Sequence, residues 1–319
     1  MPAPGLPAFD PALAAERHSL ASPLAGRLGL YVAPAASAAP PLLVVHSVNA
    51  AASVAEVRPV FEGERGRRSV VALDLPGFGR SSREPRDYSP RLMTDALHAA
   101  GRWARERLGA PELDVLALSL SCEFAARAAV EEPAVWRRLA LVSPTAFNGT
   151  RRRRGAPGSV LGPPALKRVL TWEPLGAPLF RALTRPGVVR YFLRRTYGAR
   201  DIDEQLWRDA VATARESGAE RAPLHFLSAA LFSADINDLY ERLVQPVWMS
   251  HGTRGDFTDY RGRDTVEGRA NWRFSVFQTG AMPYFEQPQA FLDELRAFLD
   301  APRSPQVPPV ATANGRTDR

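Results

Sequence analysis

The sequence predicts an α/β fold in which helices cover both faces of a mostly parallel central sheet. Short apolar runs, such as 69–75 and 113–119, alternate with longer helix-forming segments, such as 90–108 and 122–131. Continuous apolar runs are typical of strands buried on both faces, and their alternation with helices favours βαβ units. The 319 residues, 45% of them hydrophobic, are enough for one large core with an insertion.

Seven apolar runs have the length and composition of strands. They are residues 27–33, 41–47, 69–75, 113–119, 137–143, 246–251 and 272–279. Apolar residues at helical spacing predict helices over 53–61, 90–108, 122–131 and 288–300, and a further one around 236–243, just before the seventh strand, 246–251.

The alternation of strands and helices stops between Thr150 and Asp235, where the chain becomes helical, aromatic and basic. We therefore expect four parts. The core comprises 1–149 and 236–300, a helical cap or lid comprises 150–235, and a proline-rich tail, 301–319, is expected to be disordered.

One serine lies between a predicted strand and a predicted helix, in the sequence Ala117-Leu118-Ser119-Leu120-Ser121. A nucleophile on such a strained turn needs small residues two positions before and after it, because strand and helix approach closely there. Ala117 and Ser121 satisfy this requirement. If Ser121 were the nucleophile, Glu123 would occupy a small position, so Ser119 is the better candidate.

Two earlier segments accompany this turn, and together the three resemble the α/β-hydrolase superfamily. The strand 69–75 ends in Asp74-Leu75-Pro76-Gly77-Phe78-Gly79, which is similar to a strand-end loop of that family. The strand 41–47 leads into His46-Ser47-Val48-Asn49, which resembles the family's His-Gly oxyanion loop with Ser47 in place of glycine. The resemblance implies an α/β-hydrolase fold with an inserted cap.

The resemblance also implies roles for individual residues. Ser119 would be the nucleophile, and the backbone N–H groups of Leu120 and Val48 would form the oxyanion hole next to His46, with Asn49 as an additional side-chain donor. After the strand 246–251 the family usually places an Asp where this chain has Gly255. Asp256 follows one residue later and is the predicted acid, with Asp259 as the alternative.

The triad histidine is missing from its usual place. Residues 280–286 resemble the family's Gly-His-x-Pro-x-x-Glu ending, but Ala281 occupies the histidine position. Alanine cannot accept a proton, and no histidine follows His251.

Three other histidines are alternative bases. His46 and His251 each end a predicted strand at the sheet edge where ligands bind in open α/β folds. His225 could reach Ser119 from the cap. His251 is our predicted base, while His18 and His98 are expected to be exposed or simply packed.

The positive charge of the chain is local. From Arg151 to Arg200 the sequence has twelve Arg and Lys residues and one acid, Glu173, which gives +11, while the whole chain carries +7. The interpretations are a solvated arginine-rich surface or attraction to an anionic membrane or acidic lipid. Nucleic acid is disfavoured because no binding motif is present.

Other classes of protein are not indicated. Cys122 is the only cysteine, so an internal disulfide is excluded, and its apolar surroundings predict a buried core residue. No metal-ligand cluster and no nucleotide-binding glycine pattern occurs, so we expect neither a metal nor a cofactor. Without a leader-like start or a membrane-length apolar run, the chain is predicted to be cytoplasmic.

Two hypotheses about function follow. The first is an esterase-like or lipase-like serine hydrolase that acts on a hydrophobic small-molecule ester through Ser119 and a relocated base. The second is a binding or scaffolding protein that has lost general-base catalysis. Lyase or isomerase chemistry in the same cleft is a further alternative, because the fold does not specify one reaction.

Overall fold

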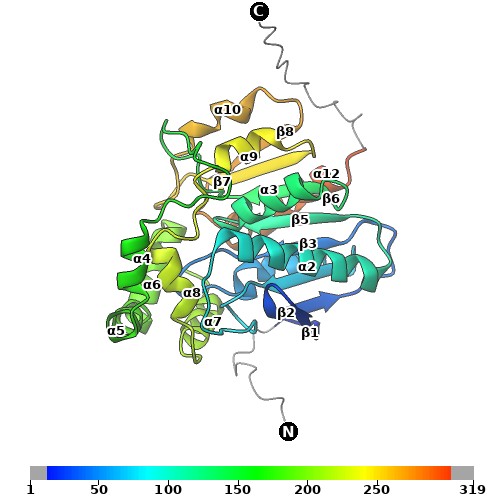
Figure 1. The fold of residues 1–319 in the computed structure, drawn as a ribbon. Helices are drawn as coiled ribbons and strands as arrows, with labels where there is room; N and C mark the ends of the chain where they lie inside the picture. The colour runs from blue at the N-terminus through cyan, green and yellow to red at the C-terminus, as the bar shows by residue number, and fades with distance from the viewer. Residues whose placement is uncertain (1–12, 303–319) are drawn as a thin grey trace, which may run out of the picture.

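The structure, a computed structural model, describes residues 13–302, and eight strands in this range form one sheet (Figure 1). Their order is β1-β2-β4-β3-β5-β6-β7-β8, in which β3 to β8 are parallel and β2 is antiparallel to both of its neighbours. The strands are β1 (Glu16–Ser22), β2 (Gly26–Ala33), β3 (Leu42–Val45), β4 (Val70–Asp74), β5 (Leu113–Leu118), β6 (Trp136–Val142), β7 (Val247–Gly252) and β8 (Trp272–Phe277).

The predicted fold class is confirmed, and each of the seven predicted strands is present with its ends shifted by at most two residues. The sequence analysis missed β1, which forms a hairpin with β2 at the edge of the sheet. None of its residues is fully buried, so β1 lacks the apolar run by which the other strands were predicted.

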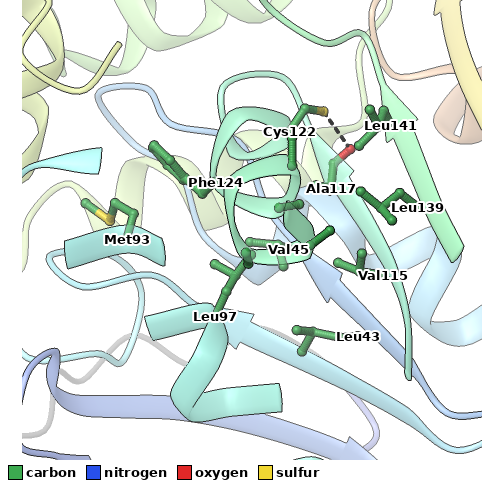
Figure 2. Packing of buried hydrophobic residues seen from close by; sticks show 14 of the residues in the cluster. Leu43, Val45, Met93, Leu97, Val115, Ala117, Cys122, Phe124, Leu139 and Leu141 are labelled. Atoms are coloured by element: carbon green, nitrogen blue, oxygen red, sulfur yellow. Dashed lines mark hydrogen bonds between the residues drawn. The ribbon is translucent and has the colours of Figure 1, made fainter. Parts of the chain in front are cut away.

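Helices pack on both faces of the sheet, because side chains of successive strand residues point to opposite sides. Val115 of β5 belongs to the core shared with α2, α3 and α9, whereas Leu116 belongs to the core shared with α1 and α12. Figure 2 shows the first of these cores, with Leu97 and Phe124 packed over the sheet. The core helices are η1 (Val54–Val57), α1 (Arg58–Glu64), α2 (Pro90–Leu108), α3 (Ser121–Glu131), α9 (Ile236–Arg242), η2 (Arg261–Arg263), α10 (Asp264–Glu267), α11 (Pro283–Glu286) and α12 (Pro288–Leu299).

The segment between β6 and α9, which the sequence assigned to a cap, is helical and gathers at one end of the molecule (Figure 1). Its helices are α4 (Pro164–Leu170), α5 (Glu173–Leu183), α6 (Pro186–Tyr197), α7 (Glu204–Thr213) and α8 (Arg221–Leu227). We call this segment the cap. It contacts the loop after β3, where Ala50 and Ala51 pack against its apolar residues.

A buried ion-pair network lies at the amino-terminal end of β5. The Asp114 carboxylate accepts two hydrogen bonds from Arg137, one of them at 2.8 Å, and lies 3.7 Å from Arg68. Arg68 also pairs with Glu64 at 2.7 Å and with Asp300 at 2.6 Å. The network therefore connects the sheet with α1 and with the end of α12.

The predicted disordered tail, 301–319, lies outside the described residues except for 301 and 302. The start of the chain, 1–12, also lies outside them. Within residues 13–302, no helix combines the length and the apolar character needed to cross a bilayer.

We expect Asp114→Ala to lower the free energy of unfolding by about 3 kcal/mol or more, because it leaves the partly buried guanidinium of Arg137 without its carboxylate and removes one of the three carboxylates around the buried Arg68. Denaturant unfolding followed by circular dichroism measures the change. The control is Glu267→Ala, which removes the exposed pair with Arg263 and should cost less than about 1 kcal/mol. Equal losses for the two variants would contradict a stabilising role for the network.

Candidate active site

Ser119 lies directly between β5 and α3 in a strained backbone conformation. Its φ is +57°, in the left-handed region that residues with a Cβ rarely adopt. Its N–H donates to the Val142 carbonyl at 2.8 Å, and its own carbonyl accepts from the Cys122 N–H at 3.1 Å. Such strain costs about 1–2 kcal/mol and is concentrated at functional sites. The backbone therefore has the geometry of a nucleophile elbow.

Small buried residues surround the elbow. Ala117 in β5 and Ser121 at the start of α3 are fully buried, and the Ser121 hydroxyl donates to the His46 carbonyl. Cys122 is also fully buried, as the sequence predicted, and its Sγ lies 3.2 Å from the Ala117 carbonyl oxygen (Figure 2). Larger side chains at these positions would separate α3 from the sheet.

Two backbone N–H groups at the carboxyl edge of the parallel strands have no acceptor among the described residues. They belong to Val48 and Leu120, and within residues 13–302 neither donates a hydrogen bond. Both follow strands that are neighbours in the sheet, β3 and β5, so the chain places them at the same edge. They are the pair that the sequence predicted for the oxyanion hole, and their hydrogen-bonding capacity remains available.

His46 and Asn49 hold this loop in place. The Nε2 atom of His46 accepts from the Leu75 N–H at 3.0 Å, and its Nδ1 contacts the Ser47 carbonyl. The Asn49 amide nitrogen donates to the Ser47 hydroxyl at 2.9 Å and to Glu56 at 2.6 Å. Both ring nitrogens of His46 and the amide nitrogen of Asn49 are therefore engaged, so His46 is not a free base and Asn49 is not a free oxyanion donor.

Ser119 and His251 lie in one row across three adjacent strands. Leu118 of β5 pairs with Val142 of β6, which pairs with Ser250 of β7. Ser119 and His251 each come one residue later. Two spacings of roughly 4.8 Å separate their Cα atoms by about 10 Å. Within the described residues the Ser119 hydroxyl makes no hydrogen bond to a side chain, so no imidazole contacts it directly.

His251 has the protonation state that a general base needs. Its Nδ1 lies 2.9 Å from the Gly252 carbonyl oxygen, which requires a proton on Nδ1 and leaves a lone pair on Nε2. Nε2 is buried and has no hydrogen-bond partner among the described residues. Burial, together with nearby Arg263, lowers the pKa of His251 below its usual value near 6.5. The ring is therefore neutral at pH 7, stacked on Tyr260 at 3.9 Å.

The predicted acid does not meet this histidine. The Asp256 carboxylate binds Arg195 of α6 at 2.5 and 2.6 Å. Asp259, the alternative, binds Arg261 and accepts from the Gly149 N–H at 2.9 Å. The hydrogen bonds from Arg261 hold the pKa of Asp259 well below its usual range. The sequence-based pairing of Asp256 with His251 is therefore wrong for this structure, because an arginine of the cap takes the carboxylate.

The end of α6 covers both loops in which the family would place its acid and its histidine. The Ala281 N–H donates to the Thr196 carbonyl at 2.9 Å. A Cβ on the neighbouring Gly280 would lie 2.5 Å from the Tyr197 backbone, and a Cβ on Gly255 would lie 2.3 Å from the Arg195 carbonyl oxygen. Backbone atoms of the cap therefore lie so close to Gly255 and Gly280 that a side chain at either residue would clash with them.

The remaining histidines are tied to other groups. His225 in α8 lies 2.9 Å from the Arg221 carbonyl oxygen and 3.2 Å from Asp87, and it lines a cavity of about 320 Å³ between the cap and the loop before α2. His98 lies 2.9 Å from Glu131. His18 lies 3.3 Å from Glu16 in β1. The contacts of these three rings are with groups other than Ser119.

Sequence reasoning missed two buried acids beside the site. Glu56 accepts from the Ser47 N–H at 2.8 Å and from Asn49, and so braces the oxyanion loop. Glu123, one turn after Ser119, is fully buried and pairs with Arg153 at 3.0 Å. Burial raises the pKa of Glu123. An acid within the apolar, alanine-rich helix 122–131 was the available signal for Glu123.

The strain at Ser119 has a measurable consequence. We expect Ser119→Gly to be more stable than Ser119→Ala by about 1 kcal/mol, because only glycine adopts a positive φ without cost. At Ser121, which is helical, the order should reverse by a similar amount. Denaturant unfolding of the four variants checks both orders. If alanine is the more stable replacement at both sites, the backbone at Ser119 is not strained.

Comparisons with known proteins agree with this architecture. Residues 40–160 match the sequence model of the family described as alpha/beta hydrolase fold. No curated protein matches the chain significantly.

Similar solved structures include a probable hydrolytic enzyme from Pseudomonas aeruginosa PAO1, which is 20% identical with a TM-score of 0.69, the match covering 92% of this chain and 96% of that one. Carboxylesterase CesB from Bacillus subtilis is 16% identical with a TM-score of 0.65, over 91% of this chain and 93% of that one. A thermophilic esterase from Thermogutta terrifontis is 18% identical with a TM-score of 0.66, over 90% of this chain and 98% of that one. The protein therefore has the α/β-hydrolase fold, and its residues 40–160 carry the sequence pattern of that family.

Proposed function

We propose that this protein is a serine hydrolase that cleaves esters of hydrophobic small molecules, with Ser119 as nucleophile and His251 as general base. The observation that carries the proposal is the strained Ser119, held next to the unbonded N–H groups of Val48 and Leu120. A fold that only binds a ligand has no need to keep a serine in a costly conformation beside two free donors. The esterase activities of two structurally similar proteins support the same reaction class.

The reaction follows the general course of serine acyl transfer. The Ser119 hydroxyl oxygen attacks the ester carbonyl carbon, and its proton passes to Nε2 of His251. The negative charge that develops on the carbonyl oxygen is stabilised by the N–H groups of Val48 and Leu120. Collapse expels the alcohol, which takes the proton from His251, and water then hydrolyses the acyl-serine.

Ser119 and His251 are too far apart for direct proton transfer. Because the two Cα atoms are about 10 Å apart, the two side chains reach each other through one water or after the ring turns toward Ser119. Its neutral state and free Nε2 lone pair suit His251 to this role better than His46, whose two ring nitrogens are both occupied.

Among residues 13–302, no carboxylate pairs with His251. The Gly252 carbonyl fixes the tautomer but adds no negative charge to stabilise the imidazolium. In a complete triad, loss of the acid costs about 10⁴-fold in turnover. We therefore propose a slow hydrolase.

The contacts of the cap favour a hydrophobic substrate. Ala50 and Ala51, next to the oxyanion loop, pack against the cluster that contains Phe180 and Leu224, and Ala51 also packs against the cluster that contains Val189. A substrate held between this loop and the cap would therefore meet mainly apolar side chains.

A second candidate function is binding without catalysis. The position of the cap favours it, because cap backbone leaves no room for a side chain at Gly255, where the family places its acid, and accepts a hydrogen bond from Ala281, which stands in place of the family's histidine. Lyase or isomerase chemistry in the same cleft is a third reading of the same fold. Labelling of the nucleophile separates the first candidate from the second, and product analysis separates hydrolysis from the third.

We expect a fluorophosphonate probe to label the wild-type protein at Ser119, because an activated serine attacks phosphorus as it attacks a carbonyl. Ser119→Ala should abolish the label, and Ser121→Ala, the neighbouring serine, should retain it. Intact-mass spectrometry and peptide mapping identify the site. If only Ser121→Ala loses the label, Ser119 is not the nucleophile. If the wild-type protein takes no label but still binds a hydrophobic ester, the binding function is favoured.

The hydrolysis rate should depend on pH through His251. A base must be unprotonated, so the rate rises with pH through the lowered pKa of His251 and is level by pH 7. His251→Gln should reduce kcat/KM for a p-nitrophenyl ester by about 10²–10⁴-fold and remove this acidic limb. His225→Gln is the matched control and should leave the profile unchanged. If the limb persists in His251→Gln, another group is the base.

A further inference from the structure

Helices α4 and α5 lie at the outer end of the cap (Figure 1), and both leave most of their side chains exposed. None of the α4 residues is buried, and α5 buries only Gly176 and Phe180. Leu166, Val169 and Trp172 recur at three-residue spacing and are 42%, 51% and 62% exposed, and Leu175 is 42% exposed. We call these four residues, with Arg168, Arg181 and Arg185, the cap tip.

The cap tip carries a net positive charge. Arg168, Arg181 and Arg185 are exposed, and none of them pairs with a carboxylate among residues 13–302. Glu173, exposed between Trp172 and Leu175, is the one acid from 168 to 185. Two other cations of the cap are paired: Lys167 with Asp87 at 2.8 Å, and Arg190 with Glu204. The cap tip therefore combines an excess of positive charge with exposed large apolar side chains.

The arginine run 151–154, which dominates the basic segment in the sequence, is not part of this surface. Arg152 pairs with Asp264, Arg153 with Glu123 at 3.0 Å, and Arg154 with Asp238 and Glu241. These contacts fasten the start of the cap to the core. Only Arg151 of this run is exposed and has no ion pair among residues 13–302, and the arginines of the cap tip lie further along the chain.

We propose that the cap tip docks on the surface of an anionic lipid bilayer. Arginines attracted to anionic headgroups, next to tryptophan and leucine side chains that enter the interface, are the arrangement by which peripheral proteins bind membranes. A second copy of the chain fits less well, because two cap tips would bring like charges together. A nucleic acid would neutralise the arginines but leave the four apolar side chains in water.

Docking at this end would give the proposed hydrolase access to esters dissolved in the bilayer. Phe180 of α5 belongs to the cluster against which Ala50 and Ala51 of the oxyanion-loop region pack, so α5 connects the docked surface with that region. Membrane binding does not itself depend on catalysis. It is therefore tested with Ser119→Ala, so that its failure is distinct from failure of the proposed hydrolase.

The experiment is co-sedimentation of the full-length Ser119→Ala protein with two kinds of vesicle. One consists of phosphatidylcholine with roughly 30–40% phosphatidylglycerol, and the other consists of phosphatidylcholine alone. We expect binding to the anionic vesicles only, weakening as salt rises from about 0.05 to 0.5 M. Each arginine contributes about fivefold to the partition coefficient, so the combined change Arg168→Gln, Arg181→Gln and Arg185→Gln should lose on the order of 100-fold. Trp172→Ala should lose about fivefold or more.

The matched control carries the same change of charge away from the cap. It combines Arg67→Gln, Arg269→Gln and Arg273→Gln, three exposed arginines of the core, and should bind like the parent protein. Equal losses for the two triple variants would mean that net charge rather than the cap tip drives binding, and would overturn the proposal. Absence of binding at low salt, or self-association that Trp172→Ala abolishes, would also overturn it.

Discussion

The close approach of β5 and α3 around Ser119 is the constraint on which the rest of the site depends. Only Ser119 and Leu120 separate the end of β5 from the start of α3. The backbone of Ser119 therefore takes a positive φ, and the residues two positions before and after it must be small. Ala117, Ser121 and Cys122 meet this requirement, and each also contacts a neighbouring backbone or core element. The hydroxyl of Ser121 reaches the His46 carbonyl, so the same close packing also fixes the position of the oxyanion loop relative to the elbow.

The cap imposes a second constraint on the same edge of the sheet. Three successive residues at the end of α6, Arg195 to Tyr197, lie against the loops after β7 and β8 through backbone contacts. Glycine at 255 and 280 makes these contacts sterically feasible, because a Cβ at either position would clash with the end of α6. The position of the cap is therefore linked to the absence of an acid at 255. A side chain at 255 would require the cap to move.

Much of the architecture was predictable because its physical signals are local. Runs such as 69–75 and 113–119 are apolar apart from one aspartate and one serine each, a composition typical of a strand buried on both faces. The small residues around Ser119 identify the elbow without any knowledge of its partners. The edge strand β1 was missed for the same reason, since its side chains alternate between partial and full exposure. The site beyond Ser119 was less predictable. The partner of Asp256 is 61 residues away in the cap, and no spacing rule anticipates such a contact.

The sequence by itself determined the fold class, the nucleophile candidate and the loss of histidine at Ala281, because each depends on residue types at positions close together in the chain. Only the tertiary structure decided which polar groups are free. It showed that Asn49 binds Glu56, that His46 accepts from Leu75 in the loop after β4, and that Arg195 binds Asp256. Among residues 13–302, Nε2 of His251 has no hydrogen-bond partner. Hydrogen bonds and ion pairs of this kind join segments far apart in the chain, so they exist only once the sheet and the cap have packed together.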